Sequence, residues 1–217
     1  MNKALFVTLF SLLFALPLNG AENRVVMITG TSKGIGMATA HYLAEKGYHV
    51  YGTTRSSNQI PSENLHYLQV DLCDEGSIQA AVDAVLQKEG RIDILINNAG
   101  YALVGPIETL AYRDIQDQME INFYAPIRFV QAVLPAMRSQ ESGHIINISS
   151  TNAQNTPPFG SMYAASKAAL ESFSESLCLE VQPFNISVSI VEPWLGYRPV
   201  HNFEEFCSSS ERECVER

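Results

Sequence analysis

The feature that most constrains the fold is the alternation of short apolar runs with longer segments of helical period. The runs are rich in Val and Ile and predict strands at Val25–Ile28, His49–Thr54, His66–Val70, Ile92–Ile96, His144–Ile148 and Ile186–Val191. Runs that are apolar on both faces suit strands buried in a parallel sheet. The periodic segments predict helices over Gly34–Lys46, Ser77–Glu89, Arg113–Arg138 and Tyr163–Val181, with bends of the third helix at Pro126 and Pro135 as an open alternative. This alternation indicates an α/β fold with one doubly wound parallel sheet of about six strands and helices on both faces.

Composition narrows the functional classes. The chain has 217 residues, 46% of them hydrophobic, which suits one domain with one core. Its net charge is −9 and no Lys/Arg cluster occurs, which argues against nucleic acid as a partner. The four cysteines show no spacing typical of zinc or of a disulfide framework, so we expect no metal site. Cys73 and Cys178 are interpreted as small core residues.

The two ends of the chain differ from the middle. In residues 1–21, one lysine precedes about 15 mainly apolar residues, the layout of a secretory signal and short of the roughly 20 that span a bilayer. A cleaved signal, an uncleaved anchor and an upstream extension from a misassigned start are all compatible with this segment. Residues 22–193 form the expected domain. Residues 194–217 have no apolar period, and we expect a loose tail there.

A glycine-rich loop follows the first predicted strand. Residues 29–36 read TGTSKGIG and lead directly into a helix. A strand, a glycine turn and a helix N-terminus together can hold phosphate, although an ordinary turn is the alternative. No Gly-Lys-Ser/Thr follows, which argues against an NTPase. The candidate phosphate contacts are Gly30, Ser32, Lys33, Gly34, Ile35 and Gly36.

This loop resembles the cofactor loop of the short-chain dehydrogenase/reductase family, and later motifs follow in that family's order from about Arg24 to Pro193. The resemblance implies a Rossmann-type NAD(P)-binding catalytic domain. It implies further cofactor contacts from Asp71, Asn98, Gly100, Tyr163, Lys167 and Pro193. It also implies a catalytic tetrad of Asn122, Ser150, Tyr163 and Lys167. Ser149 is an adjacent rival to Ser150, which has the family's spacing from Tyr163.

The end of the second predicted strand bears on the cofactor. NAD-specific enzymes usually carry an acid there to bind the ribose hydroxyls. This chain has Arg55 instead, whose planar guanidinium suits a 2′-phosphate, and Lys33 could add a second positive charge. We therefore expect NADP(H) to be preferred over NAD(H). The alternative for Arg55 is a solvated residue at a strand end.

The reaction chemistry explains the tetrad. Tyr163 and Lys167 are four residues apart in a predicted helix and share one face. A free phenol is a slow acid or base at neutral pH, and a neighbouring ammonium makes it a better proton donor. Ser150 would hydrogen-bond the substrate oxygen, and the resemblance implies that Asn122 positions a water that relays protons to Lys167. A Ser/His hydrolase is excluded because no GxSxG motif occurs.

The sequence departs from the family after the sixth strand. Family members usually continue with Pro-Gly, a helical substrate lid and a seventh strand, whereas this chain has Pro193-Trp194 and an aperiodic tail. A shifted reading frame or premature stop is one hypothesis for this break. It would leave an unpaired strand edge, and it weakens the expectation of the homo-oligomer usual in the family.

Two functions follow from these observations. The leading one is an NADP(H)-dependent oxidoreductase that interconverts a small-molecule alcohol and a carbonyl. The alternative is a catalytically weak or inactive dinucleotide-binding protein that lacks the substrate lid. The stretch Val50–Arg55 is similar to family members that act on steroids and retinoids. Because an NADP(H) enzyme needs a cofactor supply, we expect a membrane-associated protein with a cytosol-facing domain, or a cytoplasmic one; a cleaved signal would instead give a secreted or periplasmic protein.

Overall fold

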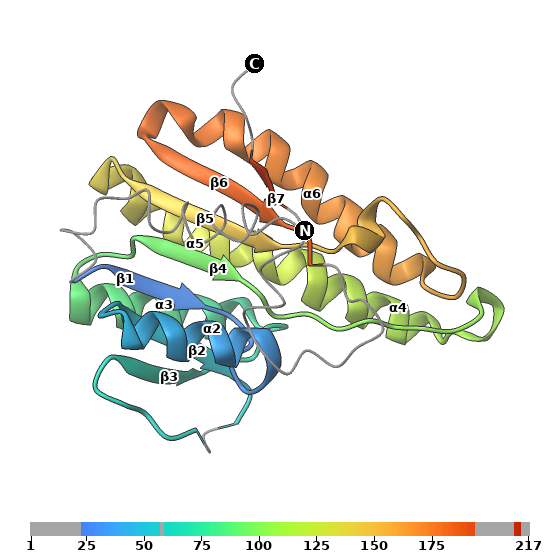
Figure 1. Ribbon diagram of the computed structural model, residues 1–217, viewed down its shortest axis with the longest axis horizontal. Coiled ribbons are helices and arrows are strands. Elements are labelled where there is room, and N and C mark those ends of the chain that lie inside the picture. Colours follow the sequence, from blue (N-terminus) through green and yellow to red (C-terminus); the bar gives the residue numbers. More distant parts are fainter. Residues whose placement is uncertain (1–22, 57–58, 194–210, 214–217) are drawn as a thin grey trace, which may run out of the picture.

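The computed structural model describes residues 23–56, 59–193 and 211–213. Within them, one seven-stranded sheet has the order β3-β2-β1-β4-β5-β6-β7 (Figure 1). The strands are β1 Val25–Ile28, β2 His49–Thr54, β3 Leu65–Gln69, β4 Ile94–Asn97, β5 Gly143–Ile148, β6 Ile186–Val191 and β7 Glu211–Glu213. The first six pair in parallel, and β7 pairs antiparallel with β6. The predicted α/β fold with a doubly wound parallel sheet is confirmed.

Helices cover both faces of this sheet. They are α2 Gly34–Glu45, α3 Glu75–Glu89, α4 Tyr112–Met119, α5 Ala125–Gln140 and α6 Ser161–Val181. One buried cluster joins α3, α5 and the end of α6 to the sheet, and a second cluster joins α2 to the opposite face. Val25 and Met27 of β1 belong to the first cluster, whereas Val26 and Ile28 belong to the second. This alternation explains why the strand is apolar throughout.

The predicted helix Arg113–Arg138 is interrupted by a π turn, which lies ahead of the bend positions Pro126 and Pro135. The chain forms α4, then a π turn at Glu120–Tyr124, then α5. Pro126 lies in the first turn of α5 and has no N–H to donate to the preceding π turn. The other predicted helices and strands are confirmed, with boundaries that shift by one or two residues.

The expectations for Cys73 and for the two ends of the chain can also be compared with the structure. Cys73 is exposed, which contradicts the interpretation as a core residue, because it lies in the loop that leads from β3 to α3. Residues 1–21 lie outside the described residues, as do residues 194–210 and 214–217. The three residues of β7 hydrogen-bond to Ser189–Val191, within the segment expected to be a loose tail. None of the helices among the described residues has the length and apolarity needed to cross a bilayer.

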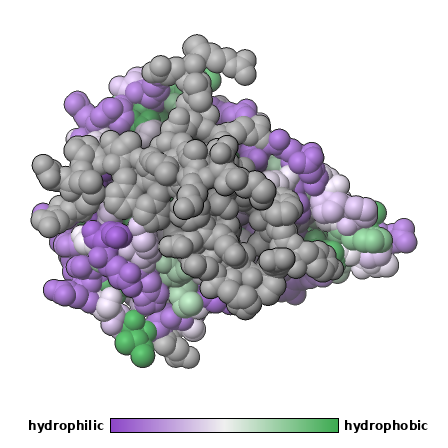
Figure 2. Space-filling model, in the orientation of Figure 1, coloured by the Kyte–Doolittle hydropathy of each residue, from purple (hydrophilic) through white to green (hydrophobic). Residues whose placement is uncertain are grey.

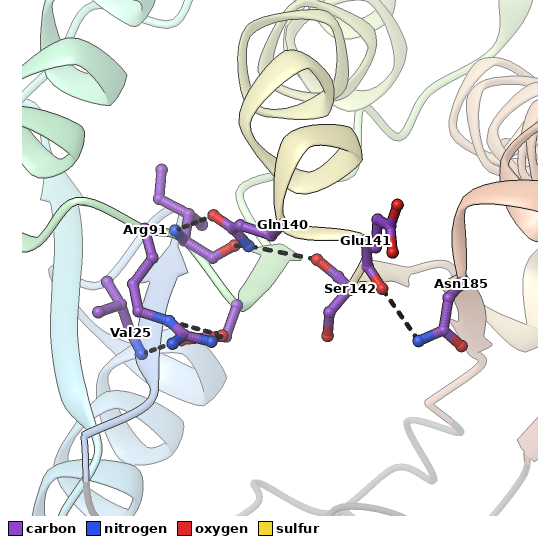
Figure 3. Close-up of polar contacts among 8 residues, drawn as sticks. Val25, Arg91, Gln140, Glu141, Ser142 and Asn185 are labelled. Carbon is purple, nitrogen blue, oxygen red and sulfur yellow. Dashed lines mark hydrogen bonds and ion pairs between the residues drawn. The ribbon is translucent and has the colours of Figure 1, made fainter.

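The amino-terminal edge of the sheet is fastened by polar side chains (Figure 3). The Asp93 carboxylate, just before β4, accepts a hydrogen bond from the Val25 N–H at 2.8 Å and pairs with the Arg91 guanidinium. The Gln140 side chain at the end of α5 accepts from the Ile92 N–H at 3.1 Å and donates to the Ile92 carbonyl at 3.0 Å. These contacts tie the start of β4 to β1 and α5.

Candidate active site

The candidate residues gather along the carboxyl edge of the sheet. Since β1 to β6 are parallel, all their carboxyl ends lie at this one edge, where open α/β sheets bind ligands. The glycine loop follows β1, and Arg55 follows β2. Asn98 and Gly100 follow β4, Ser150 follows β5, and Pro193 is a buried residue two positions after β6. Segments far apart in the sequence are therefore neighbours in the fold.

The glycine loop needs its glycines for two physical reasons. Gly30 has φ +74°, a conformation that other residues rarely adopt, and an added Cβ there would lie 2.8 Å from the Ala99 Cα. At Gly36, an added Cβ would overlap the Asn98 side-chain amide and the Gly30 carbonyl. The loop thus packs directly on the backbone that follows β4. Bulkier residues at these two positions would push the loop away from that backbone.

Thr29 and Asn98 fasten this loop to the end of β4. The Thr29 hydroxyl accepts hydrogen bonds from the N–H groups of Asn98 at 3.0 Å and Ala99 at 2.9 Å. In return the Asn98 side chain donates to the Thr29 carbonyl at 2.8 Å and the Gly30 carbonyl at 3.2 Å. Asn98 therefore shapes the loop, a role in addition to the cofactor contact expected from the family. Sequence reasoning missed Thr29, although a threonine that ends a buried strand ahead of a glycine turn is a usable signal.

The N-terminus of α2 is open toward this loop. Lys33 is the N-cap residue, and no side chain caps the helix. The first N–H groups of a helix have no intrahelical partner and attract anions together with the helix dipole. The side chains of Ser32, Lys33 and Arg55 are exposed, and Ile35 is half-buried in the first turn of the helix. These residues fit a dinucleotide whose phosphates lie at the helix N-terminus.

Asp71 lies at the same edge, in the loop after β3. Its carboxylate accepts a hydrogen bond from the Cys73 N–H at 2.9 Å, and its own N–H donates to the Ser77 hydroxyl at 3.0 Å. Both bonds are short-range, so they fix the turn between β3 and α3. The Asp71 side chain remains exposed. One carboxylate oxygen and the adjacent backbone can therefore still face a ligand.

Lys167 is the buried cation of the site. Its side chain is 4% exposed, and its ammonium donates a hydrogen bond to the Ile148 carbonyl at the end of β5 at 2.6 Å. Burial lowers the pKa of Lys167 to about 8, and the negative charge of Glu171 acts in the opposite direction. Tyr163 lies one turn earlier in α6 and is half-buried. The two side chains share one helix face, as their spacing predicts.

Asn122 lies in the π turn and is fully buried. Its side chain accepts from the Tyr101 N–H at 3.1 Å and donates to the Tyr101 carbonyl at 2.9 Å and to the Ser166 hydroxyl at 3.0 Å. Gln118 supports the same loop by accepting from the Leu103 N–H at 3.0 Å. Both N–H groups of the Asn122 amide are therefore occupied by protein acceptors. Asn122 holds the loop after β4 against α6, and π turns occur often at functional sites.

Gly100 marks the point where these elements meet. A Cβ added to Gly100 would lie 3.1 Å from the Asn122 side-chain oxygen and 3.5 Å from the Lys167 ammonium nitrogen. The structure thus brings the loop after β4, the π turn and α6 together around one glycine. Ser150 enters from β5, two residues beyond the carbonyl that holds Lys167. Its hydroxyl accepts from the Asn152 N–H at 3.2 Å, and the residue is 5% exposed.

Ser149 and Ser150 have different partners. The Ser149 hydroxyl donates to the Glu171 carboxylate at 2.6 Å, so it is directed to α6. A buried polar chain also runs beneath the site from Asn97 to Asn147 at 2.8 Å and on to Ser174 of α6 at 2.7 Å. Among the described residues, the Asn97 side-chain oxygen is the buried atom without a hydrogen-bond partner. The sheet and α6 are thus joined by side chains directly below the catalytic candidates.

Two loops beside the site carry exposed apolar side chains. They follow β4 and β5, and the Gly105 N–H of one donates to the Phe159 carbonyl of the other at 2.9 Å. The exposed apolar residues are Tyr101, Val104, Ile107 and Phe159. Figure 2 shows apolar surface at the end of the molecule where α4 begins and these loops project. This end offers apolar contacts next to a polar, cation-bearing site.

Comparison with known proteins decides the family. The family model described as short chain dehydrogenase matches residues 24–197. The chain belongs to the short-chain dehydrogenase family. The family predicted from the sequence is therefore confirmed. The match covers every described strand of the parallel sheet.

Three similar relatives illustrate the range of this family. The 3-ketodihydrosphingosine reductase of Bacteroides thetaiotaomicron is 40% identical over 196 residues, covering 88% of this chain and 71% of the relative. Human retinol dehydrogenase 8 is 38% identical, with 80% and 59% covered, and human 17-beta-hydroxysteroid dehydrogenase type 1 is 35% identical, with 89% and 62% covered. The chain thus spans about three fifths to seven tenths of the length of these relatives.

Solved structures agree with this assignment. A short-chain dehydrogenase from Streptomyces avermitilis has a TM-score of 0.76 and 37% identity, covering 79% of this chain and 65% of that one. A metagenomic short-chain oxidoreductase in complex with NADP has the same TM-score at 30% identity, with 86% and 88% covered. An NAD+-bound xylitol dehydrogenase has a TM-score of 0.76 at 28% identity, with 81% and 71% covered. Neighbours of this fold thus include complexes with either cofactor.

Proposed function

We propose that this protein is an oxidoreductase that interconverts an alcohol and a carbonyl by hydride transfer with NAD(P). The observation that carries the proposal is the buried Lys167 ammonium, held at the end of β5 one helical turn after Tyr163. A buried ammonium is costly, and such groups cluster at functional sites. The alternative, a dinucleotide-binding protein without catalysis, gives no reason to keep this charge buried.

Each polar group has a distinct part in carbonyl reduction. NAD(P)H, when bound along the carboxyl edge of the sheet, would supply the hydride for the carbonyl carbon. The Tyr163 hydroxyl donates a proton to the substrate oxygen as the carbonyl is reduced. The Lys167 ammonium stabilises the negative charge that is left on the phenol oxygen. Ser150 hydrogen-bonds the same substrate oxygen, whose charge grows in the transition state. The Ser149 hydroxyl is engaged by Glu171, which supports Ser150 for this role.

Asn122 organises the proton path in this proposal. Its amide is used to hold Tyr101 and Ser166, so its effect on Lys167 comes through the shape of the π turn. A π turn leaves a helical carbonyl without its usual partner, and such a carbonyl can hold a water. A water there would pass protons between solvent and Lys167. The Asn122 side chain thus stabilises the π turn that would hold the proton-relaying water.

We also propose a preference for NADP(H). Arg55 and Lys33 present exposed cationic side chains beside the open N-terminus of α2, and no acid ends β2. A guanidinium pairs well with a phosphate dianion. The fit is to the extra phosphate of NADP(H), since the ribose hydroxyls of NAD(H) would lack their usual carboxylate partner.

The proposed substrate is an apolar alcohol or carbonyl compound. The named relatives act on a ketodihydrosphingosine, a retinol and a hydroxysteroid. The exposed apolar side chains of the loops after β4 and β5 give such a molecule a surface to contact. Membrane association through residues 1–21, with the domain facing the cytosol, would place the enzyme near substrates of this kind.

The decisive variant is Tyr163→Phe. Loss of the phenolic proton donor should lower carbonyl reduction by about 10²–10⁴-fold, measured on a panel of apolar ketones and aldehydes with NADPH. NADPH should still raise the melting temperature of the variant, because a ligand that binds the native state stabilises it. Tyr112→Phe, an exposed tyrosine of α4, is the matched control and should retain full activity. Cofactor binding by wild type without turnover on any carbonyl would favour the binding protein instead.

The cofactor preference has its own test. Arg55→Ala should weaken NADPH binding by about 10- to 100-fold, roughly 1.4–2.8 kcal/mol, and leave NADH binding unchanged. Arg113→Ala removes another exposed arginine, from α4, and serves as the charge-matched control. Fluorescence titration of both dinucleotides against each variant gives the comparison. An equal loss of affinity for the two cofactors would contradict the phosphate role of Arg55.

A further inference from the structure

A hydrogen bond beside the catalytic candidates has no part in the chemistry described so far. The Ser149 hydroxyl donates to the Glu171 carboxylate at 2.6 Å. Ser149 is 3% exposed and follows β5, whereas Glu171 is half-buried in α6. This length is typical of a hydroxyl donating to an ionised carboxylate. A negative charge is thus fixed between the strand that carries Ser150 and the helix that carries Tyr163.

Glu171 lies four residues after Lys167 and therefore on the same face of α6. Lys167 is buried, and the acceptor that its ammonium contacts is the neutral Ile148 carbonyl. A neutral acceptor compensates little of the cost of burying a charge. The Glu171 carboxylate raises the pKa of Lys167 against the larger effect of burial. Helix geometry and electrostatics thus point to the same pair.

We propose that Glu171 is a positioning residue that keeps Lys167 in its ammonium form and is itself held in place by Ser149. This inference rests on the proposed function for its catalytic meaning. The hydrogen bond to Ser149 also ties the end of β5 to α6, the two elements that carry Ser150 and the Tyr163–Lys167 pair. One carboxylate therefore supports both the charge and the relative placement of the catalytic groups.

Four other titratable groups on or beside elements packed against α6 have partners of their own. Glu120 of the π turn binds Arg128, and Asp117 of α4 pairs with Arg113 at 3.9 Å. His144 of β5 shares a hydrogen bond with Ser189 of β6 at 2.8 Å, and Gln154 donates to Glu192 after β6 at 3.0 Å. Tyr163 is the titratable group on the same face of α6 one turn before Lys167. Among the described residues, Glu171 is the charged side chain that acts on Lys167.

The direct test is the titration of the Lys167 amino group. The chain has five lysines, so lysine labelled with ¹³C and ¹⁵N gives few NMR signals, and Lys167→Met assigns the relevant one. Glu171→Gln keeps a hydrogen-bond acceptor for Ser149 and removes the charge. Its Lys167 titration midpoint should fall by about 0.5–1.5 pH units. Glu175→Gln, one turn further along α6 and exposed, should leave the midpoint where wild type has it.

Two further variants complete this test. Ser149→Ala should lower the midpoint in the same direction by a smaller amount, because the carboxylate keeps its charge and loses its anchor. Glu171→Asp restores the charge and should return the midpoint toward that of wild type, which a merely structural role of Glu171 would not produce. Equal midpoints in wild type and Glu171→Gln would overturn the proposal. If Glu171→Gln does not fold, Glu171→Asp compared with wild type still tests the proposal. The shorter aspartate side chain holds its charge farther from Lys167, so the Lys167 titration midpoint must fall slightly.

The pH profile of turnover carries the test to function. The rate of carbonyl reduction should fall at a lower pH in Glu171→Gln than in wild type. The difference in pH between the two profiles should equal the difference in the Lys167 titration midpoint. Superimposable profiles in an active enzyme would refute a role for Glu171 in the reaction. Absence of turnover in wild type would instead refute the proposed function, and the NMR titration would still decide whether Glu171 controls the charge of Lys167.

Discussion

The two edges of the parallel sheet are built from the same strands and treat their polar groups differently. At the amino-terminal edge, Asp93 and Gln140 satisfy backbone groups of neighbouring elements (Figure 3). At the carboxyl edge, the N-terminus of α2 is uncapped, the Lys167 ammonium is buried on a neutral carbonyl, and the Asn97 oxygen is unpartnered among the described residues. The first edge is arranged for stability, and the second keeps polar groups that the fold itself does not fully satisfy.

This difference shows where the molecule accepts a cost in stability. Buried polar groups are normally satisfied, so unsatisfied ones at a ligand-binding edge indicate selection for function. Side chains at the amino-terminal edge should therefore affect folding alone. Those at the carboxyl edge should affect activity and stability in opposite directions. The following substitutions test that separation.

The largest stability effect should come from Asp93→Ala. It leaves the buried Val25 N–H without an acceptor and Arg91 without its carboxylate, at an expected loss of about 2–4 kcal/mol in the free energy of unfolding. Urea denaturation measures the loss, and Asp83→Ala on the exposed face of α3 is the control. NADPH affinity of the folded protein should not change. A weakened cofactor affinity would show that the two edges are coupled.

A gain in stability is expected from Lys167→Met, together with loss of turnover. Removing a buried ammonium should raise the free energy of unfolding by about 1–3 kcal/mol at pH 7. The pKa of Lys167 is about 8 in the folded chain and 10.5 without the fold, so the unfolded chain binds more protons between these values. Wild-type stability therefore rises with pH across this interval, and the advantage of Lys167→Met should shrink.

Denaturation of wild type and Lys167→Met from pH 7 to pH 10 measures this difference. Subtracting the two curves removes the titration of all other groups. If Lys167→Met is less stable than wild type at pH 7, the buried ammonium stabilises the fold. That result would contradict the expectation that polar groups at the carboxyl edge lower stability.

The smallest effect should come from Gln140→Ala at the amino-terminal edge. Three hydrogen bonds are lost, two to Ile92 and one to the Ser142 carbonyl at 3.2 Å, and water can replace part of them because the site is half-buried. We expect a loss of about 1–2 kcal/mol. Activity at 25 °C should equal that of wild type. Reduced turnover without reduced stability would show that Gln140 serves activity, against its assignment to the edge that stabilises the fold.

The fold was largely predictable because its signal is local. Four-residue runs such as Val25–Ile28 are apolar on both faces only if both faces are covered, and this fixes the parallel sheet. The glycine loop and the Tyr163–Lys167 spacing were likewise visible in short windows of sequence. The split between α4 and α5 was not, since apolar periodicity does not show which turn is a π turn.

The supporting residues of the site were harder to predict for a physical reason. Thr29 and Asn98 are 69 positions apart and are joined by hydrogen bonds that only the folded chain creates. The Ser149–Glu171 contact has the same character across 22 positions. A local pattern could have drawn attention to Thr29, and Asn98 was found through the family motif, but neither pattern shows that the two residues bind each other. The motif residues were found in the sequence, and the contacts that hold them in place needed the three-dimensional structure.

The π turn has a consequence for comparing this chain with other members of its family. A π turn is equivalent to one residue inserted into an α-helix, which rotates everything after it by about 100° relative to an uninterrupted helix. A heptad or helical-wheel pattern carried from α4 into α5 therefore assigns the wrong residues to the core. Deleting one residue from Glu120–Tyr124 would preserve a continuous helix and turn Asn122 and the buried face of α5 away from each other. The one extra residue of the π turn thus sets the rotation of α5 about its axis relative to α4 and the site.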